Sequence, residues 1–195
     1  MLEAHLRAPI YPDAYHFRFD HQTTPLALLF DRTESYGPEV FKSHVPARVN
    51  GEDITRLWSR YELLAPSAKS KLQLPLRWIS KSLRQSEALD AMLAIGIALE
   101  ALFLDDAIRE QHRYRLSLNG ALWLEEALQQ RLATAKSLAR AYDARSMSVH
   151  ASGNPKEETV QSARELAIRG VLLALERSTI PENWNDWIFE RCPPA

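Results

Sequence analysis

The chain has 195 residues, 46% of them hydrophobic, and its 24 Lys and Arg residues nearly balance 25 Asp and Glu residues, for a formal net charge of −1. This length predicts one main domain with a sizeable core. The balanced charge excludes a strongly basic protein, so any nucleic-acid or membrane site must rest on a local patch. The one cysteine, Cys192, excludes an intrachain disulfide framework and a cysteine-based zinc site.

Two features of the sequence, its N-terminal segment and the length of its apolar stretches, predict the cellular location of the protein. The N-terminal sequence lacks the charged segment and following apolar segment of a secretory signal. No stretch reaches the roughly 18 apolar residues of a membrane span. We therefore expect a cytoplasmic protein with no membrane partner.

Residues 1–52 differ in composition from the rest and are rich in proline and aromatic residues, which disfavours long helices. AYHFRFD at 14–20 alternates aromatic and polar residues, a pattern typical of a half-buried strand. PLALLF at 25–30 is a second candidate strand. We assign 1–52 to an N-terminal segment of unknown role, either an arm over the helical body or the remainder of a longer domain.

Residues 53–195 have apolar residues at helical spacing and are predicted to form an all-α bundle of about five to seven helices. No strand is expected between 53 and 191. The segment 86–106 is apolar on nearly every side and should be the buried central helix. The other expected helices cover 51–64, 66–85, 156–178 and 182–191, with two helices or one interrupted helix over 116–150.

Local signals add detail to this helical pattern. Pro75 should kink or restart the helix at 66–85, and Ser86 is a plausible N-cap of the next helix. The arginine-rich segment 108–115 is expected to be a link. Three tryptophans on apolar helical faces are expected in the core: Trp58, Trp78 and Trp123.

The sequence contains no glycine-rich phosphate loop, no serine elbow, no HExxH motif and no cysteine pair. Its histidines are scattered, so we expect no metal site and no cofactor. What remains is Arg145, four residues, then His150, at the end of a predicted helix before Gly153-Asn154-Pro155. Chance alone produces about half a match at any chosen offset, so only the context adds weight. That context includes Glu100, an acid on an otherwise apolar helix.

Three segments, AIGIALEALFL (94–104), RYRLSLNGALWL (113–124) and YDARSMSVH (142–150), resemble in order and spacing the Apea-like branch of the HEPN superfamily. The resemblance covers roughly residues 55 to 190. It implies a small helical bundle, commonly dimeric. Many such proteins are metal-independent RNases with an Arg, four to six residues, His motif, often toxins or antiviral effectors, and others are inactive.

The resemblance implies Arg145 and His150 as the catalytic pair, with Ser146 at the polar position that follows the arginine. The chain departs from the family in having HAS after the motif's valine in place of the usual HG, and Asn119 where a basic residue is common. Both departures bear on substrate contacts more than on the motif itself.

The chemistry of RNA cleavage through its own 2′-hydroxyl suits these two residue types. The reaction needs a group that moves protons near neutral pH, a role for His150. It also needs a fixed positive charge on the phosphorane oxygens, a role for Arg145. Five helical residues turn through about 500°, which leaves the pair about 140° apart. Either the helix unwinds near Val149 or a second subunit completes the site, so we expect a homodimer.

Other residues are expected to support the pair. Glu100 should bond to Tyr142 or Arg145, and Arg145 has a purely structural alternative in a pair with Asp143 or Glu100. His150 has the alternative of a helix terminator that interacts with the carbonyl ends. The supporting residues are therefore Ser146, Glu100, Tyr142 and Asp143. Three arginines are predicted either to bind RNA phosphates or to form a solvated helix entry: Arg109, Arg113 and Arg115.

The favoured function is a metal-independent endoribonuclease, a toxin or host-defence effector, whose partners are RNA, a second copy and an antitoxin or other protein. The alternative is a non-catalytic HEPN-type module that binds a nucleotide, RNA or a protein partner. A third hypothesis, a subunit of a larger assembly, is favoured by the unassigned N-terminal segment.

Overall fold

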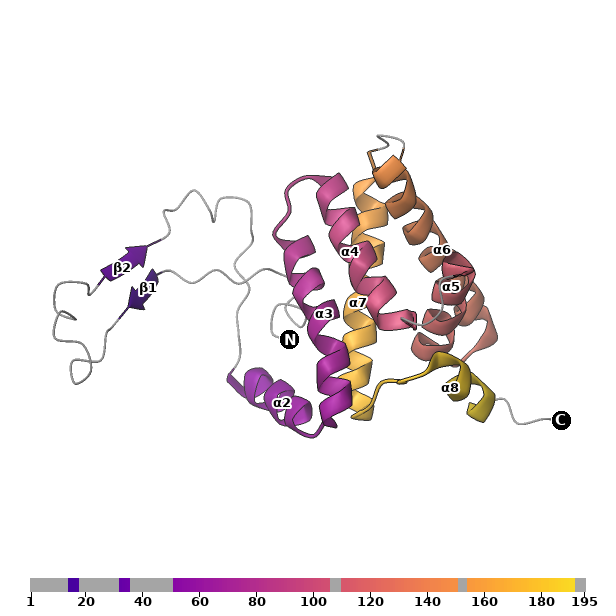
Figure 1. Cartoon of the computed structure of the whole chain (residues 1–195), viewed down its shortest axis with the longest axis horizontal. Helices are drawn as coiled ribbons and strands as arrows, with labels where there is room; N and C mark the ends of the chain where they lie inside the picture. Colours follow the sequence, from indigo (N-terminus) through magenta and orange to yellow (C-terminus); the bar gives the residue numbers. More distant parts are fainter. Residues whose placement is uncertain (1–13, 18–31, 36–50, 106–109, 151–153, 192–195) are drawn as a thin grey trace.

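The computed structural model describes residues 14–17, 32–35, 51–105, 110–150 and 154–191 (Figure 1). Strand β1 (Ala14–Phe17) pairs antiparallel with strand β2 (Arg32–Ser35), with Ala14 opposite Ser35. β1 lies within the predicted strand at 14–20. The candidate strand at 25–30 lies outside the described residues, and β2 follows it where the sequence pattern indicates no strand.

The rest of the described chain is helical, as predicted, with seven helices. They are α2 (Gly51–Glu62), α3 (Pro66–Leu83), α4 (Ala88–Phe103), α5 (His112–Leu124), α6 (Leu128–His150), α7 (Glu157–Arg177) and α8 (Trp184–Arg191). The all-α bundle and the predicted range of helix number are confirmed for this part of the chain. The first of the described helices, α2, begins just before the predicted boundary at residue 53.

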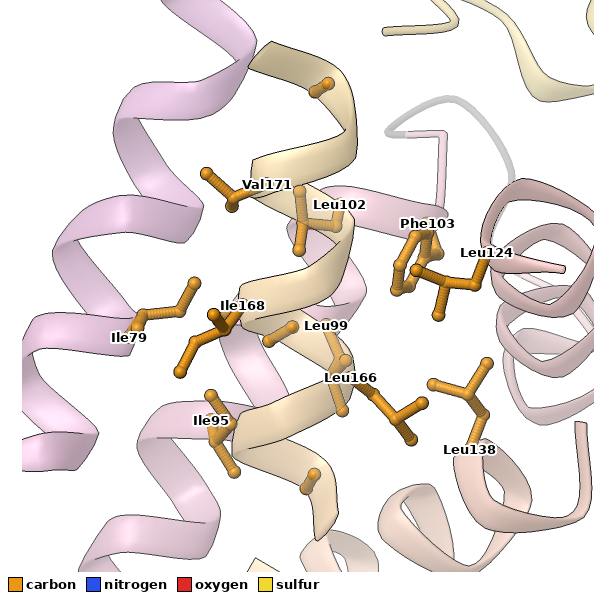
Figure 2. Close-up of a cluster of buried hydrophobic side chains, with 14 of the residues drawn as sticks. Ile79, Ile95, Leu99, Leu102, Phe103, Leu124, Leu138, Leu166, Ile168 and Val171 are labelled. Atoms are coloured by element: carbon orange, nitrogen blue, oxygen red, sulfur yellow. The ribbon is translucent and has the colours of Figure 1, made fainter. Parts of the chain in front are cut away.

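The helices form two groups that meet at α4 and α7. Helices α3, α4 and α7 lie side by side, and the α5–α6 pair packs against α4 and α7 (Figure 1). α4 has the largest buried share of any described helix, as its nearly uniform apolar composition predicts. Figure 2 shows the core between these helices. Its labelled side chains are Ile79, Ile95, Leu99, Leu102, Phe103, Leu124, Leu138, Leu166, Ile168 and Val171.

The Phe103 ring fills the space where α4, α5 and α7 meet because the facing positions are glycines. A Cβ on Gly120 would lie 3.2 Å from this ring, and one on Gly170 would lie 2.9 Å from it. The side-chain amide of Asn119 donates a 2.7 Å hydrogen bond to the Phe103 carbonyl, which satisfies a free carbonyl at the end of α4. Asn119, at the position where the family resemblance suggests a basic residue, is thus a buried structural residue.

Of the two predicted effects of Pro75, a kink or a restart, the restart is wrong, because α3 continues through Pro75 as one helix. Proline removes one backbone hydrogen bond from a helix interior. Here Leu72 and Ile79, on either side of Pro75, are fully buried in the core. Their packing holds the two halves of the helix together despite the lost hydrogen bond.

Two predictions about helix ends are also wrong. Glu87, not Ser86, is the N-cap residue of α4, and it makes no side-chain cap hydrogen bond. The segment 108–115 is not a link throughout, because α5 begins at His112 and includes Arg113 and Arg115.

The predicted helical stretch at 116–150 lies in two helices, one of the two alternatives. The chain is extended at Glu125, with φ −130° and ψ 146°, which ends α5. The Glu125 carboxylate accepts hydrogen bonds from the Thr134 hydroxyl at 2.9 Å and from Arg169 at 2.7 Å. These bonds tie the α5–α6 turn to α6 and α7.

The tryptophans only partly match the predicted core. Trp123 is buried and Trp78 packs against the core. Trp58 is 58% exposed, so its predicted core position is wrong. The reason is that α2 inserts Leu57, on a neighbouring part of its apolar face, into the core while Trp58 lies beside Tyr61 at the surface.

Helix α8 is attached by Trp184, which sequence periodicity did not single out. Trp184 is completely buried, with its ring 5.9 Å from that of Trp123 and 5.4 Å from that of Trp187 in edge-to-face geometry. Its backbone N–H also donates to the Asp105 carboxylate at 3.2 Å. The C-terminal helix is therefore part of the core.

We predict that Trp184→Ala lowers the free energy of unfolding by about 3–5 kcal/mol, because it removes a fully buried aromatic side chain. Phe189→Ala on the same helix is the control and should change it by no more than about 0.5 kcal/mol, since Phe189 is 75% exposed. Urea unfolding followed by far-UV circular dichroism measures both. Equal effects would mean that α8 does not pack through Trp184.

Candidate functional site

The candidate pair lies on the last turns of α6. This helix contains neither glycine nor proline, and its backbone stays helical through His150. Of the two alternatives, unwinding near Val149 is therefore wrong. Arg145 and His150 lie about 140° apart around one unbroken helix, so they do not share a face. The side chain of His150 lies outside the described part of the structure.

Arg145 faces α4. Its stem crosses that helix at Gly96, where an added Cβ would lie 2.5 Å from Arg145 Cγ. Its guanidinium reaches Glu100, one turn further along α4, with Nη2 3.5 Å from Oε2. The two side chains are 30% and 25% exposed, which places the ion pair at the edge of the core.

The structure distinguishes between the expected partners of these residues. Arg145 pairs with Glu100 and not with Asp143, which contacts Arg113 instead. Glu100 in turn contacts Arg145, whereas Tyr142 packs half-buried against the core. Ser146 is half-buried as well.

Arg145 differs from the other half-buried arginines in its hydrogen bonding. Each of the others donates at least one hydrogen bond: Arg115, Arg131, Arg164, Arg169 and Arg177. Among the described residues Arg145 has only the long contact with Glu100, and its Nε is buried without a hydrogen-bond partner. A buried donor left without a partner costs about 1–3 kcal/mol. Arg145 is thus a half-buried cation whose Nε is buried and unpartnered and whose Nη groups make only the long contact with Glu100, so the Nη groups are the donors that an anionic ligand could use.

Asp143 lies two turns before His150, about 20° from it around the helix axis. Arg113 of α5 binds Asp143 through two parallel hydrogen bonds, Nε to Oδ1 at 2.7 Å and Nη2 to Oδ2 at 2.8 Å. These hydrogen bonds hold the pKa of Asp143 below its usual range and raise the pKa of Arg113. Arg113 therefore carries a paired charge on the side of α6 where His150 lies.

The predicted RNA-binding arginines do not form one strip in the described part of the chain. Arg113 is paired with α6, whereas Arg115 donates a 3.3 Å hydrogen bond to the Asn185 side chain of α8. Arg109 lies outside the described residues. A role for these arginines in RNA binding stays a prediction.

Gly96 lies against the Arg145 stem but is not among the site residues predicted from the sequence. Its signal was a lone glycine in the apolar helix AIGIALEALFL, which indicates close approach of another segment. The sequence drew attention to Glu100 because it is charged. It could not show that both residues contact the same arginine.

A surface pocket of about 410 Å³ lies among the start of α3, the end of α7 and α8. Its lining includes the carboxylates of Glu182, Asp186 and Glu190 but no candidate site residue. This negative lining is unfavourable for a polyanion such as RNA.

Comparison of the chain with protein-family models, curated proteins and solved structures gives no match. Within the described ranges, no group of three or more His, Cys, Asp or Glu side chains is placed to hold a metal ion. None of the described helices combines the length and apolar character needed to span a membrane.

The Arg113–Asp143 pair predicts an acid-sensitive contribution to stability. Because the pKa of Asp143 is lowered in the folded state, the pair stabilises the fold above the unfolded pKa of about 3.9 and loses this effect as pH falls through the lower folded value. Arg113→Gln should melt below the native chain at neutral pH, and the two melting temperatures should converge below about pH 4.

The matched measurement repeats both melts in about 1 M salt, where the difference at neutral pH should shrink because the pair is exposed. A difference that is the same at every pH would show that Arg113 acts through packing and not through its charge.

Proposed function

We propose that the protein is a metal-independent endoribonuclease that cleaves RNA through its own 2′-hydroxyl, with Arg145 and His150 at the reacting phosphate. One structural observation carries the proposal. Arg145 is held at the core edge by Gly96 and Glu100, has unused donors among the described residues, and lies on the helix that ends at His150. The three segments that resemble Apea-like HEPN proteins supply the reaction type.

In this mechanism the 2′-oxygen attacks phosphorus as an imidazole removes its proton. The 5′-oxygen leaves with a proton from an acid, so the products are a 2′,3′-cyclic phosphate and a 5′-hydroxyl. The ordinary pKa of histidine, about 6.5, lets His150 take either part near neutral pH. Arg145 would bind the phosphorane oxygens through its planar donors. Glu100 would orient the guanidinium.

The separation of the pair supports a site completed by a second copy of the chain. An unbroken helix cannot bring Arg145 and His150 to one face. Met147 and Val149 are 55% and 52% exposed and lie about 160° apart around the helix, Met147 nearer the His150 side and Val149 nearer the Arg145 side, so an exposed apolar side chain lies near each member of the pair. A symmetric dimer through these ends would bring the Arg145 side of one α6 near the His150 side of the other.

The biological part of the proposal follows from the resemblance. In this proposal the protein is a toxin or host-defence effector that acts in the cytoplasm and is controlled by an antitoxin or another protein. A second candidate function is a non-catalytic module that binds a nucleotide or RNA. The same 140° separation favours this function, because Arg145 alone could bind a phosphate while His150, on another face of the helix, transfers no proton.

Substitution of the pair tests the reaction. With total RNA at neutral pH and excess chelator, the native chain should release fragments ending in 2′,3′-cyclic phosphate and leave DNA intact. His150→Ala should slow cleavage by about 10²- to 10⁴-fold. Arg145→Lys, which keeps the charge but loses the planar fork, should slow it by about 10²-fold or more.

Arg140→Ala is the matched control, because Arg140 is an exposed arginine of the same helix. It should retain cleavage. Full activity of His150→Ala would refute the proposed catalytic role, and RNA binding without cleavage by the native chain would favour the non-catalytic module. Arg145→Ala should also lower the melting temperature, because the Arg145 stem packs on α4.

Light scattering tests the second copy. The native chain should have the mass of a dimer at micromolar concentration. Met147→Asp combined with Val149→Asp should give a monomer that has lost cleavage, because charges would be buried at the interface. Leu132→Asp is the control near the other end of α6, where Leu132 is 50% exposed. A monomeric native chain that cleaves RNA would refute the shared site.

A further inference from the structure

Gly96 is a buried glycine in α4, a helix whose other small buried residues are alanines. Of the five alanines of α4, Ala91, Ala94 and Ala98 are buried, and Ala88 and Ala101 are half-buried. Glycine in a helix interior is less stable than alanine because it loses more backbone entropy on folding. Alanine would therefore be small enough for ordinary helix packing and would be more favourable in the helix. The absence of a Cβ at position 96 needs a specific cause.

The cause is the stem of Arg145. A Cβ on Gly96 would lie 2.5 Å from Arg145 Cγ, 3.1 Å from its Cβ and 3.5 Å from its Cδ. The closest atoms belong to the base of the arginine side chain, so the overlap cannot be relieved by moving the guanidinium alone. Either the Arg145 rotamer changes or α6 moves away from α4.

Gly96 and Glu100 are one helical turn apart and lie on the same side of α4. The first lets the Arg145 stem cross close to the backbone, and the second contacts its guanidinium at 3.5 Å. Together they fix both ends of one side chain. A displaced stem would move the guanidinium relative to Glu100 and to any bound phosphate.

We propose that Gly96 is a positioning residue for Arg145, an inference that rests on the proposed function for its catalytic consequence. Gly96 itself contributes no atom to the reaction. Its part is to leave the space that sets the position of the phosphate-binding guanidinium. A misplacement of about 1 Å can slow a reaction about 10²-fold.

The test compares Gly96→Ala with Gly120→Ala. The second is a matched control, because a Cβ on Gly120 would also overlap a side chain at 2.5 Å, but that side chain is Leu138 in the core. Both variants are assayed at temperatures below their melting transitions. Gly96→Ala should lower kcat by about tenfold or more, whereas Gly120→Ala should stay within about twofold of the native kcat even though its melting temperature falls.

An Arg145→Ala background separates positioning from general damage. There Gly96→Ala should cause no further loss of cleavage, because the side chain that it displaces is gone. A Gly96→Ala variant with native kcat in the native background would overturn the inference.

Melting temperatures decide the inference even if the native chain proves to have no RNase activity. With Arg145 present, Gly96→Ala should lower the melting temperature. In the Arg145→Ala background the fall should be much smaller or absent, because Cγ and Cδ are gone and only the 3.1 Å contact with the Cβ of residue 145 remains to oppose the helix-favouring effect of alanine. In an Arg145→Met background, where Cγ remains, the temperature should still fall. A rise in all three backgrounds would overturn the inference independently of cleavage.

Discussion

Helix α4 packs against α3, α5, α6 and α7, and this burial along its length governs the rest of the bundle. A helix with neighbours on all sides needs small residues where they come closest, and any charge on it needs a partner. Glu100 is a charged residue in the second half of α4, only 25% exposed, and Arg145 is its partner. The candidate site thus includes the residue that pairs with the Glu100 carboxylate at the edge of the core.

Arg164 is a half-buried arginine whose hydrogen bonds lie within the fold. Its Nε donates to the Ser82 hydroxyl at 3.0 Å and its Nη2 to the Ser82 carbonyl at 2.6 Å. The Ser82 hydroxyl donates onward to the Ala91 carbonyl at 2.9 Å, which joins α3, α4 and α7. Burial lowers the pKa of Arg164, yet its donors are used within the fold. Arg145 is likewise fixed in place, by packing on Gly96 and by the contact with Glu100, but it donates no hydrogen bond to the described residues.

Apolar spacing predicted the helices because each needs one face, or for α4 every face, away from water. It could not place Trp58 and Trp184 correctly, since which tryptophan is buried depends on the helices that come together around it. Pro75 likewise breaks the local rule because packing on both sides of it is stronger than one lost hydrogen bond. At the site, sequence suggested Glu100 as one partner of Arg145 but not the role of Gly96, which exists only as a distance between two helices.

The unbroken end of α6 separates the two residues that the proposed RNA cleavage requires. Arg145 faces inward to Glu100, while His150 follows Asp143 along the side of the helix that Arg113 contacts. One chain can therefore offer a positioned cation for a phosphate without bringing its own histidine to the same face. Binding would then depend on the α4–α6 contact within a subunit, and proton transfer on how two α6 ends meet. If two copies form the proposed dimer, their assembly, and not the folding of one chain, would decide whether the site can react.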